Sequence, residues 1–237
     1  MRRKREVPIN LYLKKVVMKT QKQLSLFAGG FGSGKTEVAL NYAVNLYKKG
    51  LSVTLVDLDI LNHYFRAGAA KKSLEKMGIA MISPREELAY ADLPALSPGI
   101  YSVLQGGQGY GVLDIGGDDL GAMVLSRYRE NMPEAGYRFF LVVNPYRPMT
   151  SDVKGIDKVK KSIESASRFE IHALVSNPNL GHGTDIEAVM NGHQTVMKAS
   201  EELGLPVDFL SIRRDLANLI AVELPLLPMD IYIKPPW

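Results

Sequence analysis

The segment GGFGSGKT at residues 29–36 constrains this chain more than any other. An apolar run at residues 24–28 precedes it, and the helix-favouring run TEVALNYAVNLYKK follows it, so the glycines lie where a strand turns into a helix. Glycine lets the backbone fold its N–H groups around an anion without Cβ clashes, and the helix N-terminus adds the positive end of its dipole. The segment therefore predicts a phosphate-binding turn.

The same segment fits the Walker A pattern of Gly, four free positions, Gly, Lys, then Ser or Thr. In such a loop the lysine reaches the β- and γ-phosphates of a nucleoside triphosphate, and the hydroxyl holds Mg²⁺. These roles fall to Lys35 and Thr36. The positions expected to contact the nucleotide are Gly29, Gly30, Phe31, Gly32, Ser33, Gly34, Lys35, Thr36 and Glu37.

Two further segments end in acidic residues. LSVTLVDLDI is typical of a buried parallel strand and ends in Asp57 and Asp59, while YGVLDIGGDD is a short strand with Asp114 at its end and a Gly-Gly pair after it. In an open α/β sheet the ligand lies beyond the C-terminal ends of the strands, so these acids should lie beside the glycine-rich turn. We expect Asp57 and Asp114 to organise the metal, with a glycine N–H near the γ-phosphate.

The remainder of the chain alternates strands and helices, which predicts the α/β class. We expect a three-layer, doubly wound, mostly parallel sheet with right-handed crossovers, the P-loop NTPase fold. Expected helices cover about 36–49, 68–77, 122–132, 151–167 and 184–203, with further strands at 79–83, 137–144, 170–179 and 206–212. The proline-rich segment LPLLPMDIYIKPPW is expected to be an extended tail anchored by Tyr232 and Trp237.

Charge divides the chain into an arm and a body. Residues 1–28 carry a net charge of +7, whereas the whole chain carries +4. We therefore expect a basic N-terminal arm or extension at 1–22 and a single domain at 23–237. Such an arm is either a solvated tail or a contact for nucleic acid or an anionic membrane.

Composition excludes several classes of function. The chain has no cysteine, which excludes disulfides, thiolate metal sites and a cysteine nucleophile. Its 4 histidines are scattered without ligand spacing, so we expect no transition-metal site. No apolar run approaches the roughly 20 residues of a membrane span, and the arm lacks the apolar stretch of a signal peptide. We expect a cytoplasmic protein without a membrane anchor.

With these motifs placed, the chain resembles the SIMIBI-class P-loop ATPases and, more narrowly, the CobQ/CobB/MinD/ParA nucleotide-binding domain. The resemblance covers about residues 23–210 and rests on GGFGSGKT, the DLD pair, LDIGG, VVNP and LVSNPN. It implies ATP and Mg²⁺ as cofactors, with Asp57 at the Mg²⁺ water shell. It also implies that Asp59 orients the attacking water and that Asn177 contacts the adenine edge. Lys35 and Asp59 are accordingly the expected catalytic residues.

One position departs from the family pattern. ParA- and MinD-type proteins carry a second lysine early in the P-loop and use it across an ATP-bound homodimer, but Gly30 occupies that place here. Glycine cannot supply the charge of that lysine, so the sequence does not decide whether the chain forms a homodimer of that kind. No arginine finger can be assigned within the chain, and Arg66 is the nearest candidate. We therefore expect slow intrinsic ATP hydrolysis.

These observations favour an ATP-hydrolysing conformational switch that acts on an unidentified protein partner. One alternative is an ATP-dependent, carboxylate-activating enzyme similar to dethiobiotin synthase, with a pocket built from His63, Tyr64, Arg66 and the 84–98 loop. The other is a DNA-associated, ParA-like positioning ATPase that uses the basic arm.

Overall fold

The computed structural model describes residues 24–59, 71–82, 98–105, 109–117, 119–133 and 136–233. The helices within these ranges are α2 (Lys35–Lys48), α3 (Lys71–Met77), α4 (Pro98–Leu104), α5 (Asp119–Ser126), α6 (Val153–Ser167) and α7 (Ile186–Leu203). The strands are β1 (Leu24–Ala28), β2 (Val53–Asp57), β3 (Ala80–Ile82), β4 (Tyr110–Asp114), β5 (Tyr137–Val143), β6 (Ala173–Ser176), β7 (Val207–Arg213) and β8 (Leu226–Met229).

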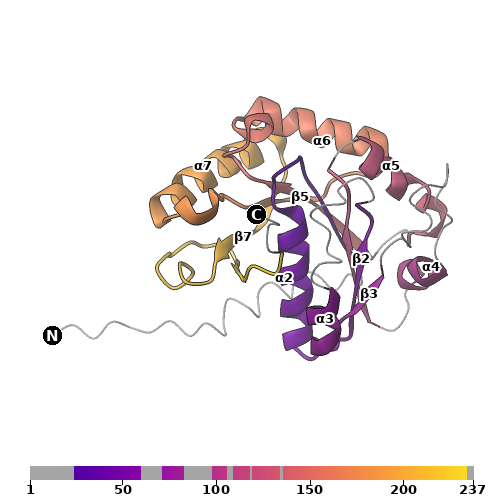
Figure 1. The fold of residues 1–237 in the computed structure, drawn as a ribbon. Coiled ribbons are helices and arrows are strands. Elements are labelled where there is room, and N and C mark those ends of the chain that lie inside the picture. Colours follow the sequence, from indigo (N-terminus) through magenta and orange to yellow (C-terminus); the bar gives the residue numbers. More distant parts are fainter. Residues whose placement is uncertain are drawn as a thin grey trace.

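The strands form one sheet in the order β3-β2-β4-β1-β5-β6-β7-β8, and each neighbouring pair is parallel (Figure 1). β1 lies in the interior of the sheet, between β4 and β5. Asp114 at the end of β4 is level with Phe27 of β1 and with Asp57 of β2. Because parallel strands end at the same edge, the turns after β1, β2 and β4 meet there.

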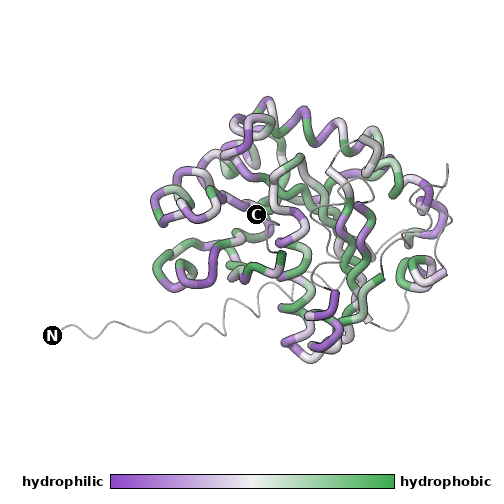
Figure 2. The backbone as a smooth tube through the Cα atoms, viewed as in Figure 1, coloured by the Kyte–Doolittle hydropathy of each residue, from purple (hydrophilic) through white to green (hydrophobic). Residues whose placement is uncertain are grey.

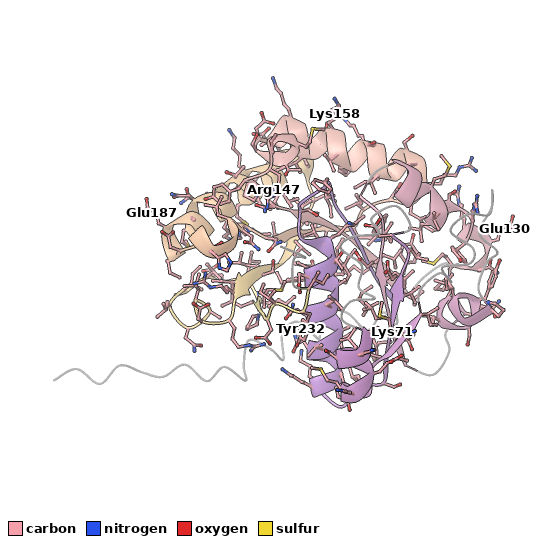
Figure 3. All side chains as sticks on the ribbon, viewed as in Figure 1. Lys71, Glu130, Arg147, Lys158, Glu187 and Tyr232 are labelled. Carbon is pink, nitrogen blue, oxygen red and sulfur yellow. The ribbon has the colours of Figure 1, made fainter. Side chains whose placement is uncertain are left out.

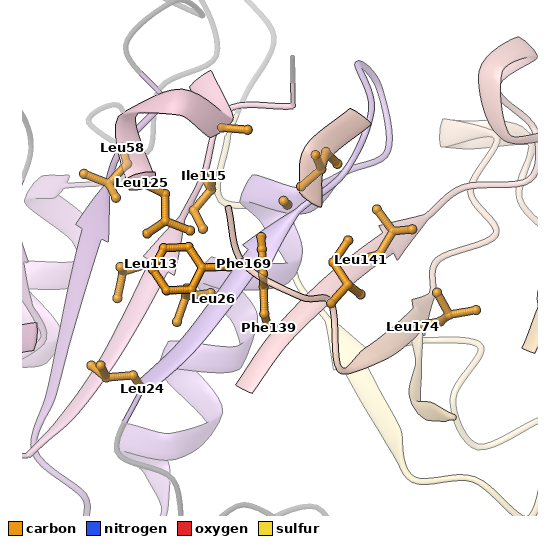
Figure 4. Packing of buried hydrophobic residues seen from close by; sticks show 14 of the residues in the cluster. Leu24, Leu26, Leu58, Leu113, Ile115, Leu125, Phe139, Leu141, Phe169 and Leu174 are labelled. Atoms are coloured by element: carbon orange, nitrogen blue, oxygen red, sulfur yellow. The ribbon is translucent and has the colours of Figure 1, made fainter. Parts of the chain in front are cut away.

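Helices cover both faces of the sheet. On one face α4, α5, α6 and α7 pack over side chains such as Leu26, Phe139 and Leu141, which Figure 4 shows in close-up. On the other face α2 and α3 pack over Phe27 and Phe140 among others. Neighbouring residues of one strand thus point to opposite layers. In Figure 2, hydrophilic and hydrophobic residues alternate along the helices, as expected for helices with one face on the sheet. The predicted three-layer α/β fold is confirmed.

An aromatic cluster fixes α2 on the sheet. The ring of Phe27 in β1 stacks on Phe140 in β5 with centroids 4.9 Å apart, and it meets Tyr42 of α2 edge-on at 5.1 Å. Tyr42 also stacks on Phe209 of β7 at 5.8 Å. Contacts of this kind add about 0.5–1.5 kcal/mol each beyond the burial of their surface. The helix that follows the glycine-rich turn therefore has a fixed position over three strands.

Two helices begin with an aspartate N-cap. Asp152 caps α6 by accepting a hydrogen bond from the Gly155 N–H at 2.7 Å. The segment TDIE at residues 184–187 has the capping-box pattern with Thr184 as N-cap, but α7 begins one residue later than this pattern predicts. Asp185, not Thr184, is its N-cap, because the aspartate accepts from the Ala188 N–H at 2.8 Å. The Thr184 hydroxyl instead donates to the Gly181 carbonyl at 2.8 Å.

Part of the C-terminal segment, which was expected to be an extended tail, joins the sheet as a strand. Leu226–Met229 form β8, which pairs in parallel with β7 at the border of the described sheet. Pro228 is tolerated there because an edge strand needs to donate hydrogen bonds on one side alone. The chain then crosses to α2, beside which Figure 3 labels Tyr232. The Tyr232 N–H donates to the Glu37 carboxylate, and its side chain packs against the core cluster that includes α2. The expected anchoring role of Tyr232 is confirmed, and Trp237 lies outside the described residues.

Several other predicted features also lie outside the described residues. These are the basic arm at 1–22, the segment with His63, Tyr64 and Arg66, and most of the 84–98 loop. Within the described ranges, no helix combines the length and apolar character needed to cross a membrane.

Candidate functional site

The glycine-rich turn at residues 29–36, called the P-loop below, folds tightly between β1 and α2. Gly32 and Gly34 have φ angles of 73° and 83°, which L side chains rarely adopt. The Ser33 N–H donates to the Gly30 carbonyl at 3.0 Å, and α2 begins at Lys35 with Gly34 as its N-cap. Because a glycine cap has no side chain to accept hydrogen bonds, the first N–H groups of α2 suit an external anion.

The turn after β4 lies directly against the P-loop. A Cβ added to Gly117 would overlap the Gly29 carbonyl oxygen. A Cβ added to Gly29 would lie 2.5 Å from the Val142 carbonyl oxygen. Glycine is therefore required at both positions by close backbone approach. This contact places the Gly-Gly pair beside the loop that is predicted to bind the phosphates.

Two side chains from distant segments hold the P-loop backbone. Asn177 follows β6, and its amide donates to the Ser33 carbonyl at 2.7 Å while its carbonyl oxygen accepts from the Ser211 hydroxyl at 2.8 Å. Arg147 follows β5, and its Nε donates to the Gly32 carbonyl at 2.9 Å. Both contacts pair carbonyls of the loop with side-chain donors, which helps to fix the loop backbone.

Lys35 lies among three carboxylates. Its Nζ is 2.8 Å from Asp59 Oδ2, and both side chains are about nine-tenths buried. Asp57 lies next to this pair and accepts the Asp59 N–H at 3.0 Å. Burial lowers the pKa of Lys35, but the charges of Asp114 and Asp59 outweigh it and hold the pKa above its usual value. Lys35 therefore carries its positive charge at neutral pH.

Asp114 is the most deeply buried of these acids, with 1% of its surface exposed. Burial raises its pKa to about 6, against the opposing effects of Lys35 and the Thr36 hydroxyl. The Thr36 hydroxyl is near enough to lower the pKa of Asp114, but the contact does not meet hydrogen-bond geometry. Within the described ranges, neither carboxylate oxygen of Asp114 has a hydrogen-bond partner, and neither does the Ser33 hydroxyl. Buried polar atoms of this kind normally have partners, so these point to a ligand.

The donor set fits Mg²⁺ bound together with phosphate. Mg²⁺ is usually held by one or two carboxylates, waters and substrate phosphates rather than by a cage of protein ligands. Asp114, with Thr36 and Asp57 beside it, supplies such a partial shell. Within the described ranges, no group of three or more His, Cys, Asp or Glu side chains is arranged to hold a metal ion.

The structure brings most of the predicted site residues together at one edge of the sheet. Lys35, Thr36 and the three predicted aspartates converge there, and Gly29 to Gly34 form the loop beside them. Phe31 is at the tip of this loop and 82% exposed. The side chain of Asn177 binds the P-loop backbone at Ser33 and is not exposed beside the loop. Glu37 directs its carboxylate to the tail, where the N–H groups of Tyr232 and Ile233 donate to it.

Sequence reasoning missed two contributors to the site. Arg147 stands in the segment NPYRPM, where the neighbouring prolines indicate a turn but give no sign that the arginine reaches the P-loop. Ser211 lies within β7, and its sequence context does not distinguish it from an ordinary serine in a strand. Contacts between segments that are 115 and 34 residues apart depend on the strand order, which the sequence pattern leaves open.

No family model matches the chain, and no curated protein matches it either. Solved structures do. The signal recognition particle receptor FtsY from Elizabethkingia anophelis shares 18% identity over 91% of this chain and 68% of its own length, with a TM-score of 0.52. Chloroplast FtsY from Physcomitrella patens shares 13% over 85% and 66%, with a TM-score of 0.57. FlhF complexed with GMPPNP and Mg²⁺ shares 14% over 85% and 72%, with a TM-score of 0.50.

At these identities the likeness concerns the fold alone. These neighbours share the fold of the chain, and they do not test its resemblance to the CobQ/CobB/MinD/ParA branch. The chain thus has a P-loop NTPase fold with its predicted phosphate turn at the expected edge.

Proposed function

We propose that this chain is a Mg²⁺-dependent ATP-binding protein that hydrolyses ATP as a conformational switch for a protein partner. One observation carries the proposal. At the end of a P-loop, Lys35 is buried between Asp59 and Asp114, and the carboxylate of Asp114 has no hydrogen-bond partner within the described ranges. Such a cluster of perturbed groups beside an anion cradle is typical of a functional site.

The ion pair of Lys35 with Asp59 suggests how phosphate binding leads to hydrolysis. A triphosphate on the P-loop N–H groups offers Lys35 a more highly charged partner than Asp59. As Lys35 turns to the phosphates, Asp59 gains the capacity to accept a hydrogen bond from water in line with the γ-phosphate. Positioning water is the main protein contribution that remains once the phosphates are clamped.

Mg²⁺ would be held by Thr36 and Asp114, with Asp57 next to them, and would neutralise charge on the phosphate oxygens. Hydrolysis removes the group that draws Lys35 away, so the lysine returns to Asp59. The turns after β2 and β4 would change conformation when Lys35 exchanges Asp59 for the phosphates, because Asp59 lies in the first turn and Gly117 in the second. A partner that contacts these turns would distinguish the two nucleotide states.

Turnover measurements test the proposal. Lys35→Ala is expected to lower nucleotide affinity at least 100-fold, because it removes the cation that reaches the phosphates. Asp59→Asn is expected to keep affinity within threefold of wild type and to lower turnover at least tenfold. Lys154→Ala removes the same charge from the exposed side of α6 and should change neither value. Equal turnover in the Asp59 variant would show that its role is wrong.

A guanine nucleotide is the alternative that a specific observation favours, because the structural neighbour FlhF is complexed with GMPPNP and Mg²⁺. Competition between ATP and GTP for the wild-type protein decides between the two. A preference of more than tenfold for ATP supports the adenine assignment. The reverse preference replaces ATP with GTP and leaves the roles of Lys35, Asp59 and Asp114 unchanged.

A further inference from the structure

Arg147 is held at the P-loop by a rigid turn. Its N–H donates to the Asn144 carbonyl at 3.1 Å, and its carbonyl accepts from the Thr150 N–H at 2.9 Å. The Thr150 hydroxyl donates to the same Asn144 carbonyl at 2.7 Å, and Asn144 is 1% exposed. Figure 3 shows Arg147 near the start of α2, where the P-loop ends. The backbone that carries this arginine is therefore preorganised.

The guanidinium of Arg147 has different partners from those of Arg138, Arg213 and Arg214. Arg138, Arg213 and Arg214 each bind a carboxylate through two nitrogens. Arg147 bonds through Nε to the Gly32 carbonyl, and among the described residues no carboxylate pairs with it. Its two terminal nitrogens stay available on an exposed side chain beside an anion cradle. This combination is typical of phosphate recognition.

We propose that Arg147 is a second cation of the phosphate site, contacting the γ-phosphate of the bound triphosphate from within the same chain. Nε keeps the Gly32 carbonyl, and a terminal nitrogen donates to a phosphate oxygen. The inference rests on the proposed function. Arg147 would supply the second positive charge that Gly30 cannot supply, in the manner of an arginine finger acting in cis. Charge that develops on the γ-phosphate during hydrolysis would strengthen the contact.

Arg147→Lys separates this role from a purely structural one. Lysine can still donate to the Gly32 carbonyl, but its single nitrogen lacks the planar fork that reaches carbonyl and phosphate together. We expect turnover to fall at least tenfold, while the melting temperature stays within 2 °C of wild type and ADP affinity within threefold. Affinity for a non-hydrolysable triphosphate should fall more than affinity for ADP. Lys158→Ala removes one exposed cation from α6 and should match wild type throughout.

Two results would overturn the inference. Turnover of Arg147→Lys within twofold of wild type would show that no phosphate contact matters. An equal loss of affinity for ADP and for the triphosphate, together with a lower melting temperature, would show that Arg147 only supports the loop. Both results presuppose a wild-type protein that binds nucleotide, so they are distinct from a failure of the proposed function, in which the wild type itself binds none.

Discussion

Lys35 and Glu37 lie two residues apart in the first turn of α2, but the polar groups around them are satisfied in opposite ways. Near Lys35, the oxygens of Asp114 and the Ser33 hydroxyl are buried without a hydrogen-bond partner in the described part of the chain. Glu37 accepts N–H groups from Tyr232 at 3.1 Å and Ile233 at 2.6 Å. On the Glu37 side of the helix start the polar groups are paired within the chain, and on the Lys35 side we propose that an anion and its metal bind.

The complete side is a tail clasp, by which we mean Glu37, Asn41 and Arg214 holding residues 230–233. Asn41 donates to the Asp230 carbonyl at 2.9 Å and accepts its N–H at 2.8 Å. Arg214 binds the Asp230 carboxylate through two nitrogens. Where the fold needs buried polar groups, it therefore pairs them internally. The contrast indicates that the groups around Lys35 are kept for a ligand, and four substitutions test it.

Asp114→Asn should give the largest effect on the phosphate side. Removal of the carboxylate is expected to lower Mg²⁺-dependent nucleotide affinity about 10–100-fold, while the melting temperature is not lowered, because burial already disfavours the charge. Nucleotide titrations with and without Mg²⁺, together with thermal unfolding, measure both. Asp208→Asn is the control, since it breaks an internal pair with Arg138 and should lower stability alone. If Asp114→Asn behaves like this control, Asp114 is structural.

Asn177→Ala should break the support of the P-loop. It leaves the Ser33 carbonyl and the Ser211 hydroxyl without their partner, which costs about 3 kcal/mol of unfolding free energy. Nucleotide affinity is expected to fall as well, because the loop loses an anchor. Urea unfolding and nucleotide titration provide the measurements. Asn179→Ala changes the same residue type outside the P-loop and should leave affinity intact. A loss of affinity without any loss of stability would favour direct base contact instead.

Glu37→Gln tests the tail side of this comparison through the pH dependence of the unfolding free energy. Burial raises the pKa of Glu37 from 4.5 to about 6, opposed by the two tail N–H groups. A raised carboxyl pKa means that the folded state binds the proton more tightly. Its contribution to stability is therefore full below pH 4.5 and is lost as pH rises through 6. The difference in unfolding free energy between wild type and variant should change by about 2 kcal/mol across this window.

Chemical denaturation from pH 4 to pH 8 checks this prediction. Asp114 titrates in the same direction, so the difference between wild type and Glu37→Gln is the quantity to follow rather than the wild type alone. A difference that is constant with pH would contradict the burial of Glu37 beneath the tail.

Arg214→Ala should give the smallest effect. Its pair with Asp230 lies at the surface, where such contacts contribute about 0.2–1 kcal/mol and are screened by salt. Thermal unfolding at low and high ionic strength should show a small loss that shrinks with salt. A loss above 2 kcal/mol would mean that the ion pair, rather than the buried hydrogen bonds of Glu37 and Asn41, holds the tail.

The sequence predicted the phosphate side better than the clasp. GGFGSGKT determines its own local geometry, and acids at the ends of parallel strands must share an edge whatever the exact strand order. Asp57, Asp59 and Asp114 could therefore be placed from pattern alone. By contrast, LPLLPM was not predicted as a strand, because its prolines are acceptable only at a sheet edge, and edge position is a property of the whole fold.

Contacts between side chains and partners that are far away in the sequence could not be predicted, for the same reason. Glu37 follows a Walker A motif and was expected to contact nucleotide, but its direction is set by a tail that arrives from β8. Arg147 and Asn177 reach the P-loop because β5 and β6 lie on that side of β1. Sequence spacing does not contain this information.

Calorimetric titration of the wild-type protein with ATP and GTP, each with and without Mg²⁺, tests the central claim most directly. The account predicts binding of one nucleotide per chain that strengthens at least tenfold when Mg²⁺ is present. A folded protein that takes up neither nucleotide in the presence of Mg²⁺ would contradict it.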